Sequence, residues 1–176
     1  MGLQRVLGSW RPRSDDEVGC LVRSRWSADL PLPFSRHRFN PGHFTVSAFV
    51  LSAQADAVLV VFHRKMRRWV QPGGHIEATD PDLLSAARRE VAEETGLVDV
   101  EVMQSGLFDL NIHQVAARAC EPAHQHFDLS FLFRSTGGGA VEGDGVSGVR
   151  WVPISKLSTF PDVGLFRAGQ RLVTRW

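Results

Sequence analysis

The chain has 176 residues, of which 43% are hydrophobic and 22% charged, and its formal net charge at pH 7 is +1. This composition is typical of one globular domain with a sizeable core, and it excludes extensive disorder. The nearly balanced charge excludes a general attraction to nucleic acid or to membrane surfaces, so we expect neither as a partner.

Cysteine usage and hydropathy narrow the class of protein further. The spacing of Cys20 and Cys120 fits neither a zinc site nor a disulfide framework. No apolar run approaches the roughly eighteen residues of a membrane span, and the N-terminus lacks the apolar centre of a signal peptide. We therefore expect a cytoplasmic protein.

The first 42 residues are predicted to form an N-terminal extension, followed by one domain over residues 43–176. The extension carries seven arginines against four acidic residues. Its pattern indicates a helix over residues 15–29 between two proline-containing segments. Such an extension can cover a sheet edge, take part in a homodimer or shape substrate access, and the sequence leaves these roles open.

Apolar and β-branched runs predict a series of strands, some of them joined as hairpins. Together with the helix that interrupts them, they indicate an α/β fold with a mixed sheet and helices on its faces. The expected strands cover residues 43–51, 57–63, 98–103, 106–115, 127–134 and 149–152.

Two other segments have a distinct character. Residues 161–176 are predicted to form an amphipathic helix whose apolar line is Val163, Phe166, Val173 and Trp176. A basic cluster follows the second strand and is either a solvated hairpin tip or a rim that attracts phosphate. It consists of Arg64, Lys65, Arg67 and Arg68.

The chain is organised around a glycine turn, Gly73-Gly74, and the helix that follows it. Asp80 is expected to cap a helix over residues 81–95, with Pro81 at its first position and Gly96 just after its end. At about 100° per residue, three glutamates fall in one sector of this helix. Like charges so close repel one another, and carboxylates at this density suit a hard cation such as Mg²⁺. A metal-dependent phosphate chemistry is therefore the hypothesis for Glu90, Glu93 and Glu94.

Two stretches together resemble the signature box of the Nudix hydrolases. They are Pro72-Gly73-Gly74-His75-Ile76-Glu77 and Arg89-Glu90-Val91-Ala92-Glu93-Glu94-Thr95-Gly96-Leu97, and the second stretch matches in full. The first half departs from the pattern, because Asp80 stands where the family has a glutamate and Arg89 follows one residue late. An insertion in the loop, or an acid supplied by Asp80 or Asp82, reconciles the spacing.

The resemblance implies a Nudix-like α/β/α sandwich with a central mixed β-sheet. It also implies a Mg²⁺-dependent hydrolase, with Mn²⁺ as a substitute, acting on a small nucleotide-derived molecule. The bond cleaved is the pyrophosphate of a nucleoside diphosphate linked to another moiety, as in ADP-ribose-like or nucleoside triphosphate substrates. A Nudix fold that binds a nucleotide as a sensor without cleaving it is the alternative, kept open by the irregular first half of the box.

Residue roles follow from the same resemblance. The metal ligands are expected to be the Gly74 carbonyl, Glu90, Glu93 and Glu94. The catalytic residues are Glu93, Glu94, Arg89 and Glu90: Glu93 or Glu94 orients or deprotonates water, and Arg89 holds the glutamates in place through charge-assisted hydrogen bonds. Glu142, in a glycine-rich loop before the last strand, is either an additional carboxylate of the site or a plain solvent-exposed acid.

Substrate-binding residues are less closely specified. His75 is expected to orient the glycine turn or a phosphate, and Arg68 belongs to the basic cluster. Trp69 and Phe108 are candidates for stacking on a base, although aromatic residues more often pack in a core or a lid. A third function, a nucleic-acid-binding accessory protein that uses the arginines of residues 1–42 and 64–68, predicts salt-sensitive binding without turnover.

Three of the seven histidines fall on or near consecutive predicted strands. They are His113, His124 and His126. Alternate residues of a strand point to one face, so the last two share a face. Their imidazoles either bind Zn²⁺ or bind substrate, and the sequence alone leaves the choice open.

Overall fold

The computed structural model describes residues 2–118 and 120–174. Four α-helices are present in this part of the chain: α1 (Leu3–Ser9), α2 (Asp15–Ala28), α3 (Leu83–Thr95) and α4 (Val163–Val173), with a 3-10 helix, η1, at Ile154–Thr159. The strands are β1 (Gly42–Leu51), β2 (Ala57–His63), β3 (Arg68–Val70), β4 (Gly73–His75), β5 (Val100–Val102), β6 (Asp109–Val115), β7 (His124–Ser135) and β8 (Val146–Pro153). None of the helices described is long and apolar enough to cross a membrane.

The strands form one sheet whose main path has the order β3-β2-β1-β7-β5. In addition, β4 pairs with β1, β6 with β7 and β8 with β2. The predicted α/β fold, a central mixed sheet with flanking helices, is confirmed. All six predicted strands are present, and the two short strands β3 and β4 and the helix α1 are additions.

The chain divides into two interleaved compact units. The first contains residues 1–46, 74–87 and 106–131, and the second contains residues 47–73, 88–105 and 132–176. Because β1, β7 and α3 each continue from one unit into the other, neither unit corresponds to a single stretch of chain.

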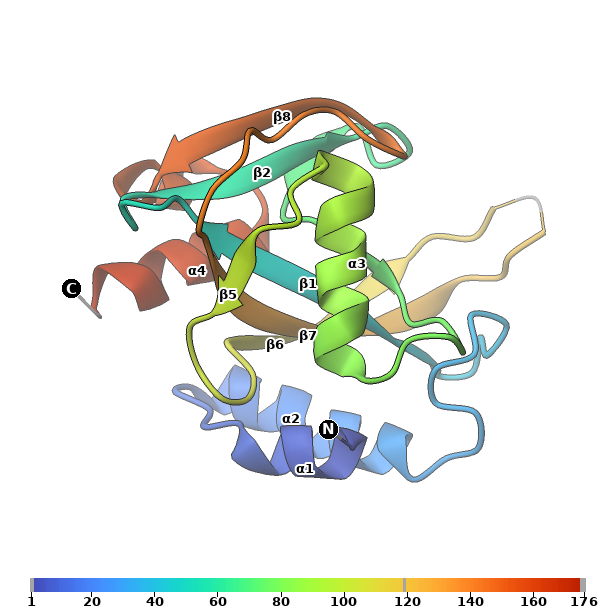
Figure 1. Ribbon diagram of the computed structural model, residues 1–176. Helices are drawn as coiled ribbons and strands as arrows, with labels where there is room; N and C mark the ends of the chain where they lie inside the picture. The colour runs from blue at the N-terminus through green and yellow to red at the C-terminus, as the bar shows by residue number, and fades with distance from the viewer. Residues whose placement is uncertain (1, 119, 175–176) are drawn as a thin grey trace. The chain divides into compact units, whose positions relative to one another are not determined.

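In the first unit, β6 pairs with β7 from Asp109↔Ser130 to Val115↔His124 in antiparallel register. Helices α1 and α2 lie side by side (Figure 1). Arg23 of α2 donates a hydrogen bond of 2.8 Å to the side chain of Gln125 on β7. This contact connects the N-terminal helices to the strand that carries His124 and His126.

In the second unit, β2 lies between β3 and β8 and pairs antiparallel with both. Strand β8 runs beside β2 in Figure 1. Val61, Val70 and Val146 pack together from these three strands. Helix α4 packs against η1. The short strand β3 leads through Gln71 and Pro72 directly to the glycine turn, so the pairing of β2 with β3 fixes where that turn begins.

Parts of the long strands have apolar residues at successive positions because they are buried on both faces. All ten residues of β1 are buried. On β7 the successive residues Phe131, Leu132 and Phe133 are each at most 2% exposed. A strand covered on both sides has a continuous apolar sequence rather than an alternating one.

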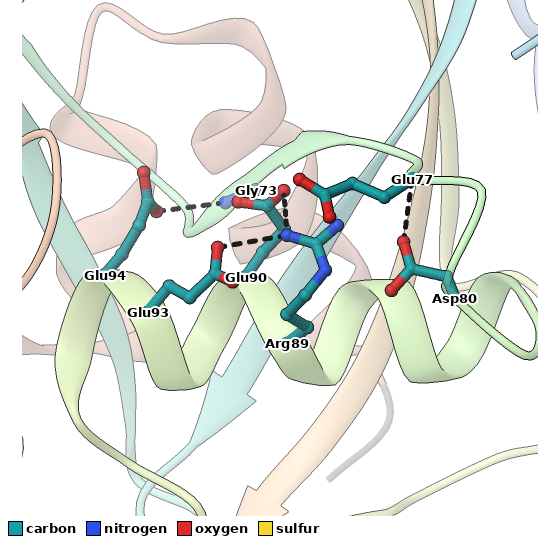
Figure 2. Close-up of polar contacts among 7 residues, drawn as sticks. All are labelled: Gly73, Glu77, Asp80, Arg89, Glu90, Glu93 and Glu94. Atoms are coloured by element: carbon teal, nitrogen blue, oxygen red, sulfur yellow. Dashed lines mark hydrogen bonds and ion pairs between the residues drawn. The ribbon is translucent and has the colours of Figure 1, made fainter.

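Helix α3 starts two residues later than predicted, and Asp80 is not its cap. The Asp82 carboxylate accepts a hydrogen bond of 2.8 Å from the backbone N–H of Ser85, which is the N-cap interaction. The Asp80 carboxylate instead accepts one of 2.8 Å from the backbone N–H of Glu77 (Figure 2). Both acids therefore stabilise local backbone, one in the loop and one at the helix end.

The predicted apolar face of the C-terminal helix is wrong. Val163 and Val173 are 60% and 63% exposed, whereas Leu165, Ala168 and Leu172 of α4 are buried. The buried face also includes Gly169, where an added Cβ would lie 2.9 Å from the Cβ of Leu157 in η1. The prediction missed this face because Ala168 and Gly169 add little hydrophobic signal to it, and Trp176 of the predicted line lies outside the described residues.

Candidate functional site

The last turns of α3 carry three glutamates and one arginine, and the arginine contacts two of the glutamates (Figure 2). One terminal nitrogen of Arg89, Nη1, donates to Oε1 of Glu90 and to Oε2 of Glu93, at 3.0 Å in each case. The guanidinium offsets the repulsion between the two carboxylates and fixes the direction in which each points. Helical spacing brings the groups together, and Arg89 sets their orientation.

Glu94 is the most buried of the three glutamates, with 7% of its surface exposed. Its Oε2 accepts a hydrogen bond of 3.1 Å from the backbone N–H of Gly73, in the glycine turn (Figure 2). Burial is the main cause that raises the pKa of Glu94 to about 8; the hydrogen bond from Gly73 opposes the shift, and the charges of Glu90 and Glu93 add to it.

This set of donors fits a divalent cation. Hard cations such as Mg²⁺ take oxygen ligands, and three carboxylates of one helix supply them. A cation would also oppose the raised pKa of Glu94, which is caused mainly by burial, because positive charge favours the ionised carboxylate. Gly74, the other expected ligand, lies in β4 and belongs to the first unit; its role stays a prediction.

A loop from the glycine-rich segment binds the C-terminal end of α3. The backbone N–H groups of Val141, Gly143 and Asp144 donate to the carbonyls of Thr95, Glu94 and Glu93 at 2.8, 3.0 and 2.9 Å. These carbonyls are among those that a helix leaves unpaired at its end. The loop thereby brings the backbone of Glu142 to the end of the carboxylate helix, although the Glu142 side chain is exposed.

Gly143 is required for this contact. A Cβ at this position would lie 2.0 Å from the carbonyl oxygen of Glu93. No side chain fits there, so the loop can approach the helix only with glycine at this residue.

The predicted base-stacking and phosphate-binding residues have other contacts. The Arg150 guanidinium lies 3.9 Å from the ring centroid of Trp69, and Phe62 packs against the same ring. Arg68 lies 3.8 Å from Asp162, the residue that caps α4. Phe108 is only 3% exposed, so its ring packs in the interior and offers no open face to a base.

His75 lies in the first unit among other histidines. Its ring centroid is 5.1 Å from that of His43 and 5.4 Å from that of His126. Burial lowers the pKa of His75 to about 4 and lowers that of His126 far below its usual range, with neighbouring histidines adding to both effects. The rings of His75 and His126 are therefore neutral at pH 7.

The histidines that meet are not the three that the sequence grouped. Ring nitrogens of His43, His75 and His126 lie within 4.8 Å of one another, the one such group of potential metal ligands in residues 2–118 and 120–174. His113 contacts the His126 ring at 5.3 Å, but it is outside this group. The sequence analysis did not include His43 in the group, because only the pairing of β1 with β7 brings this residue close to His126. The one feature of the sequence that pointed to it was its position at the start of a predicted strand.

The chain is similar in sequence to one protein family and in fold to several solved structures. The NUDIX domain pattern matches residues 41–176, and no curated protein matches the sequence. A NUDIX-family hydrolase from Clostridium perfringens has a TM-score of 0.57 at 24% identity, over 81% of this chain and 99% of its own. An Ap4A hydrolase from C. elegans, solved as a binary complex, has a TM-score of 0.53 at 10% identity, over 75% of this chain and 96% of its own.

A third solved structure is similar over a larger part of the chain. The NUDIX domain of NrtR from Shewanella oneidensis, solved with ADP ribose, has a TM-score of 0.52 at 18% identity, over 86% of this chain and 97% of its own. At these identities the likeness is one of fold, and it confirms the predicted Nudix-like sandwich. Because the family pattern covers most of the sequence, this chain belongs to the Nudix hydrolase superfamily.

Proposed function

We propose that this Nudix-type pyrophosphohydrolase depends on Mg²⁺ and cleaves the pyrophosphate bond of a nucleoside diphosphate linked to another moiety. The observation that carries the proposal is the carboxylate group of α3. Glu90 and Glu93 are oriented by Arg89, while Glu94 is buried with a raised pKa. Such an arrangement calls for a bound cation, and phosphate groups are the usual remaining ligands of Mg²⁺ in proteins.

The reaction assigned to these residues is attack of water on phosphorus. When bound, Mg²⁺ neutralises the charge that develops on the phosphate oxygens. Glu90, Glu93 and Glu94 provide the oxygen ligands, and Arg89 holds Glu90 and Glu93 in position. Glu93 or Glu94 accepts a proton from the attacking water. A new P–O bond forms to the water oxygen as the bridging P–O bond breaks, and the departing phosphate leaves.

The substrate class is proposed more broadly than a single compound. Two of the structures with a similar fold were solved as a complex with ADP ribose and as an Ap4A hydrolase complex. ADP-ribose-like molecules, dinucleoside polyphosphates and nucleoside triphosphates all contain the bond that the α3 carboxylates would act on. A homodimer, a cytoplasmic location and the separate N-terminal extension over residues 1–42 remain predictions.

The proposal is tested by product release from ADP-ribose, diadenosine tetraphosphate and a nucleoside triphosphate, with Mg²⁺, Mn²⁺ or a chelator. We expect turnover with either metal, none with chelator, and a loss of at least about a hundredfold in kcat for Glu94→Gln. Glu101→Gln is the matched control, because Glu101 is also a glutamate paired with an arginine, Arg134, in the second unit. Equal turnover in the parent and Glu94→Gln proteins would contradict the proposal.

In the same experiment, a nucleotide-binding sensor would give a different result from an enzyme. Asp80, in place of the family's glutamate, uses its carboxylate to bind the backbone of Glu77. If this departure removes activity, calorimetry will detect nucleotide binding while no product forms with any metal. Binding without turnover across the substrate panel would replace the enzyme proposal with that of a nucleotide-binding sensor.

A further inference from the structure

Three histidines of the first unit come from three strands and lie close together. His43 is the second residue of β1, His75 ends β4, and His126 lies on β7. Ring centroids are 4.7 Å apart for His43 and His126, and 5.1 Å apart for His43 and His75. Their nitrogen atoms all lie within 4.8 Å of one another. The spacing is that of side chains able to share a single ion.

A close approach of two strands creates this arrangement. Gly42 has φ of +147°, and a Cβ there would lie 1.8 Å from the carbonyl oxygen of Gln125. The backbone N–H of Gln125 also donates to the carbonyl of Pro41 at 3.0 Å. Only glycine permits such an approach, and it brings His43 against the histidines on either side of Gln125.

Hydrogen bonds fix the tautomer of His43. Its Nδ1 lies 3.2 Å from the backbone carbonyl of Arg38. A carbonyl oxygen can only accept, so Nδ1 carries the proton and Nε2 of the neutral ring presents a lone pair. This Nε2 is buried and has no hydrogen-bond partner within the described part of the chain, and the residue is 1% exposed. A buried acceptor without a partner is unfavourable, and a metal ion would satisfy it.

His124 has the same arrangement. Its Nδ1 lies 2.8 Å from the backbone carbonyl of Pro122, which directs its Nε2 lone pair away from that carbonyl. Histidines that bind metals commonly donate their other ring N–H to a backbone carbonyl or carboxylate, which fixes the ring and its tautomer. Both His43 and His124 are therefore held in the state that a metal ion requires.

The distance between His124 and His126 supports coordination. Their Nε2 atoms are 3.2 Å apart. Two nitrogens bound to one tetrahedral Zn²⁺ at about 2.0–2.1 Å would be about 3.3 Å apart. The atoms therefore already have the separation of two ligands of one ion, and His124, although outside the group of three, is a candidate for a fourth ligand.

The chemistry of these ligands favours a transition metal over Mg²⁺. Neutral imidazoles suit Zn²⁺, Co²⁺, Ni²⁺ and Cu²⁺, whereas Mg²⁺ prefers oxygen ligands. Burial lowers the pKa values of His43 and His126, which keeps their lone pairs available at neutral pH. A surface pocket lined by Phe39, Pro122 and His124 exposes one side of His124.

We propose that His43, His75 and His126 bind a divalent transition-metal ion of the Zn²⁺ class, with His124 as the fourth ligand. The site lies entirely within the first unit and does not depend on the proposed hydrolase activity. Because His75 directly follows Gly74, the ion would fix the end of β4 at the point where the glycine turn is complete.

The test uses Co²⁺ as a probe with the full-length chain, free of any polyhistidine tag and first treated with chelator. We expect visible absorption typical of tetrahedral Co²⁺, saturating at about one ion per chain and displaced by Zn²⁺ but not by excess Mg²⁺. A Glu93→Gln/Glu94→Gln protein should keep this absorption, as should His113→Gln, in which a neighbouring histidine outside the triad is changed. His43→Gln and His126→Gln should lose it.

Absence of the absorption in the parent protein would overturn the proposal, as would its loss in the double glutamate variant with retention in His126→Gln. Should the histidine variants fail to fold, the parent protein still decides the question through its imidazole nitrogen resonances. Zn²⁺ should shift those of His43, His75 and His126 and leave exposed His37 unchanged. Unshifted resonances in the triad would exclude the site, whatever the outcome of the hydrolase assay.

Discussion

Arg89 is the residue on which the orientation of the α3 carboxylates depends. A single nitrogen serves both Glu90 and Glu93 at 3.0 Å, and the Arg89 side chain is 21% exposed. A lysine would keep the charge, but its flexible ammonium group lacks the rigid planar geometry of guanidinium. The two carboxylates would then no longer be oriented by one shared hydrogen-bond donor, although the helix would remain.

We therefore expect Arg89→Lys to lower kcat by about tenfold or more, because misplaced catalytic groups slow a reaction more than they weaken substrate binding. Steady-state kinetics with saturating Mg²⁺ checks this. Arg134→Lys is the matched control, since Arg134 pairs with Glu101 away from the α3 carboxylates. Unchanged kcat in Arg89→Lys would show that Arg89 has no role in positioning.

The raised pKa of Glu94 should make the stability of the metal-free protein depend on pH. Its pKa rises from 4.5 to about 8 on folding, so its stabilising effect is fully present below about pH 4.5 and is lost as pH rises through about 8. Mg²⁺ would bind the ionised form and compensate. We expect the increase in Tm caused by Mg²⁺ to be larger at pH 8 than at pH 6, as measured by scanning calorimetry.

Glu94→Gln provides the comparison for this measurement, because glutamine cannot ionise. The metal-free variant should lose less stability than the parent protein between pH 6 and pH 8. If the parent and variant have the same pH dependence, another group is responsible and the assignment to Glu94 fails.

At the scale of elements, α3 and the loop over residues 141–144 are held together by backbone hydrogen bonds and act as one unit. Three backbone hydrogen bonds join the loop to the carbonyls of Glu93, Glu94 and Thr95. A displaced loop would leave these carbonyls unpaired and free the end of the helix that carries the glutamates. The structure of the loop and the position of the carboxylates are thus coupled.

Gly143→Ala should break this coupling, because its Cβ would lie 2.0 Å from the Glu93 carbonyl oxygen. We expect a decrease of about 1–3 kcal/mol in the free energy of unfolding, together with reduced kcat. Urea unfolding and kinetics check the two effects. Gly139→Ala is the control, because a Cβ there meets nothing within 4 Å; equal behaviour of the two variants would refute the proposed coupling.

At the scale of the whole molecule, the net charge of +1 gives little general attraction for an anionic substrate. Local patches must provide any attraction. The turn between β2 and β3 exposes Arg64, Lys65 and Arg67, and it lies shortly before the glycine turn in the chain. Whether this tip is a phosphate-attracting rim or only a solvated turn is therefore a measurable question.

Replacing Arg64, Lys65 and Arg67 with glutamine should raise KM a few-fold while leaving kcat nearly unchanged, if the tip attracts substrate. The effect should shrink as salt is added, because exposed charges are screened. A control protein with glutamine at Arg13, Arg25 and Arg36 loses the same number of positive charges elsewhere. Equal KM values in the two proteins would identify the tip as solvated surface only.

Much of the fold and of the carboxylate site could be predicted because it depends on local rules. Helical periodicity places Glu90, Glu93 and Glu94 in one sector whatever surrounds them. Apolar runs located six of the eight strands in the described residues. Local rules failed where neighbours competed: Asp80 looked like a helix cap, but its carboxylate binds the Glu77 backbone, which leaves Asp82 as the cap.

The sequence by itself determined the family, six of the eight described strands and the carboxylates of α3, since each is encoded in a short stretch of residues. Only the tertiary structure decided which face of α4 is buried and which histidines meet. His43 joins His75 and His126 through the pairing of strands distant in the chain and the close approach at Gly42. Strand order and register are set by packing of the whole sheet, so no local pattern could specify them.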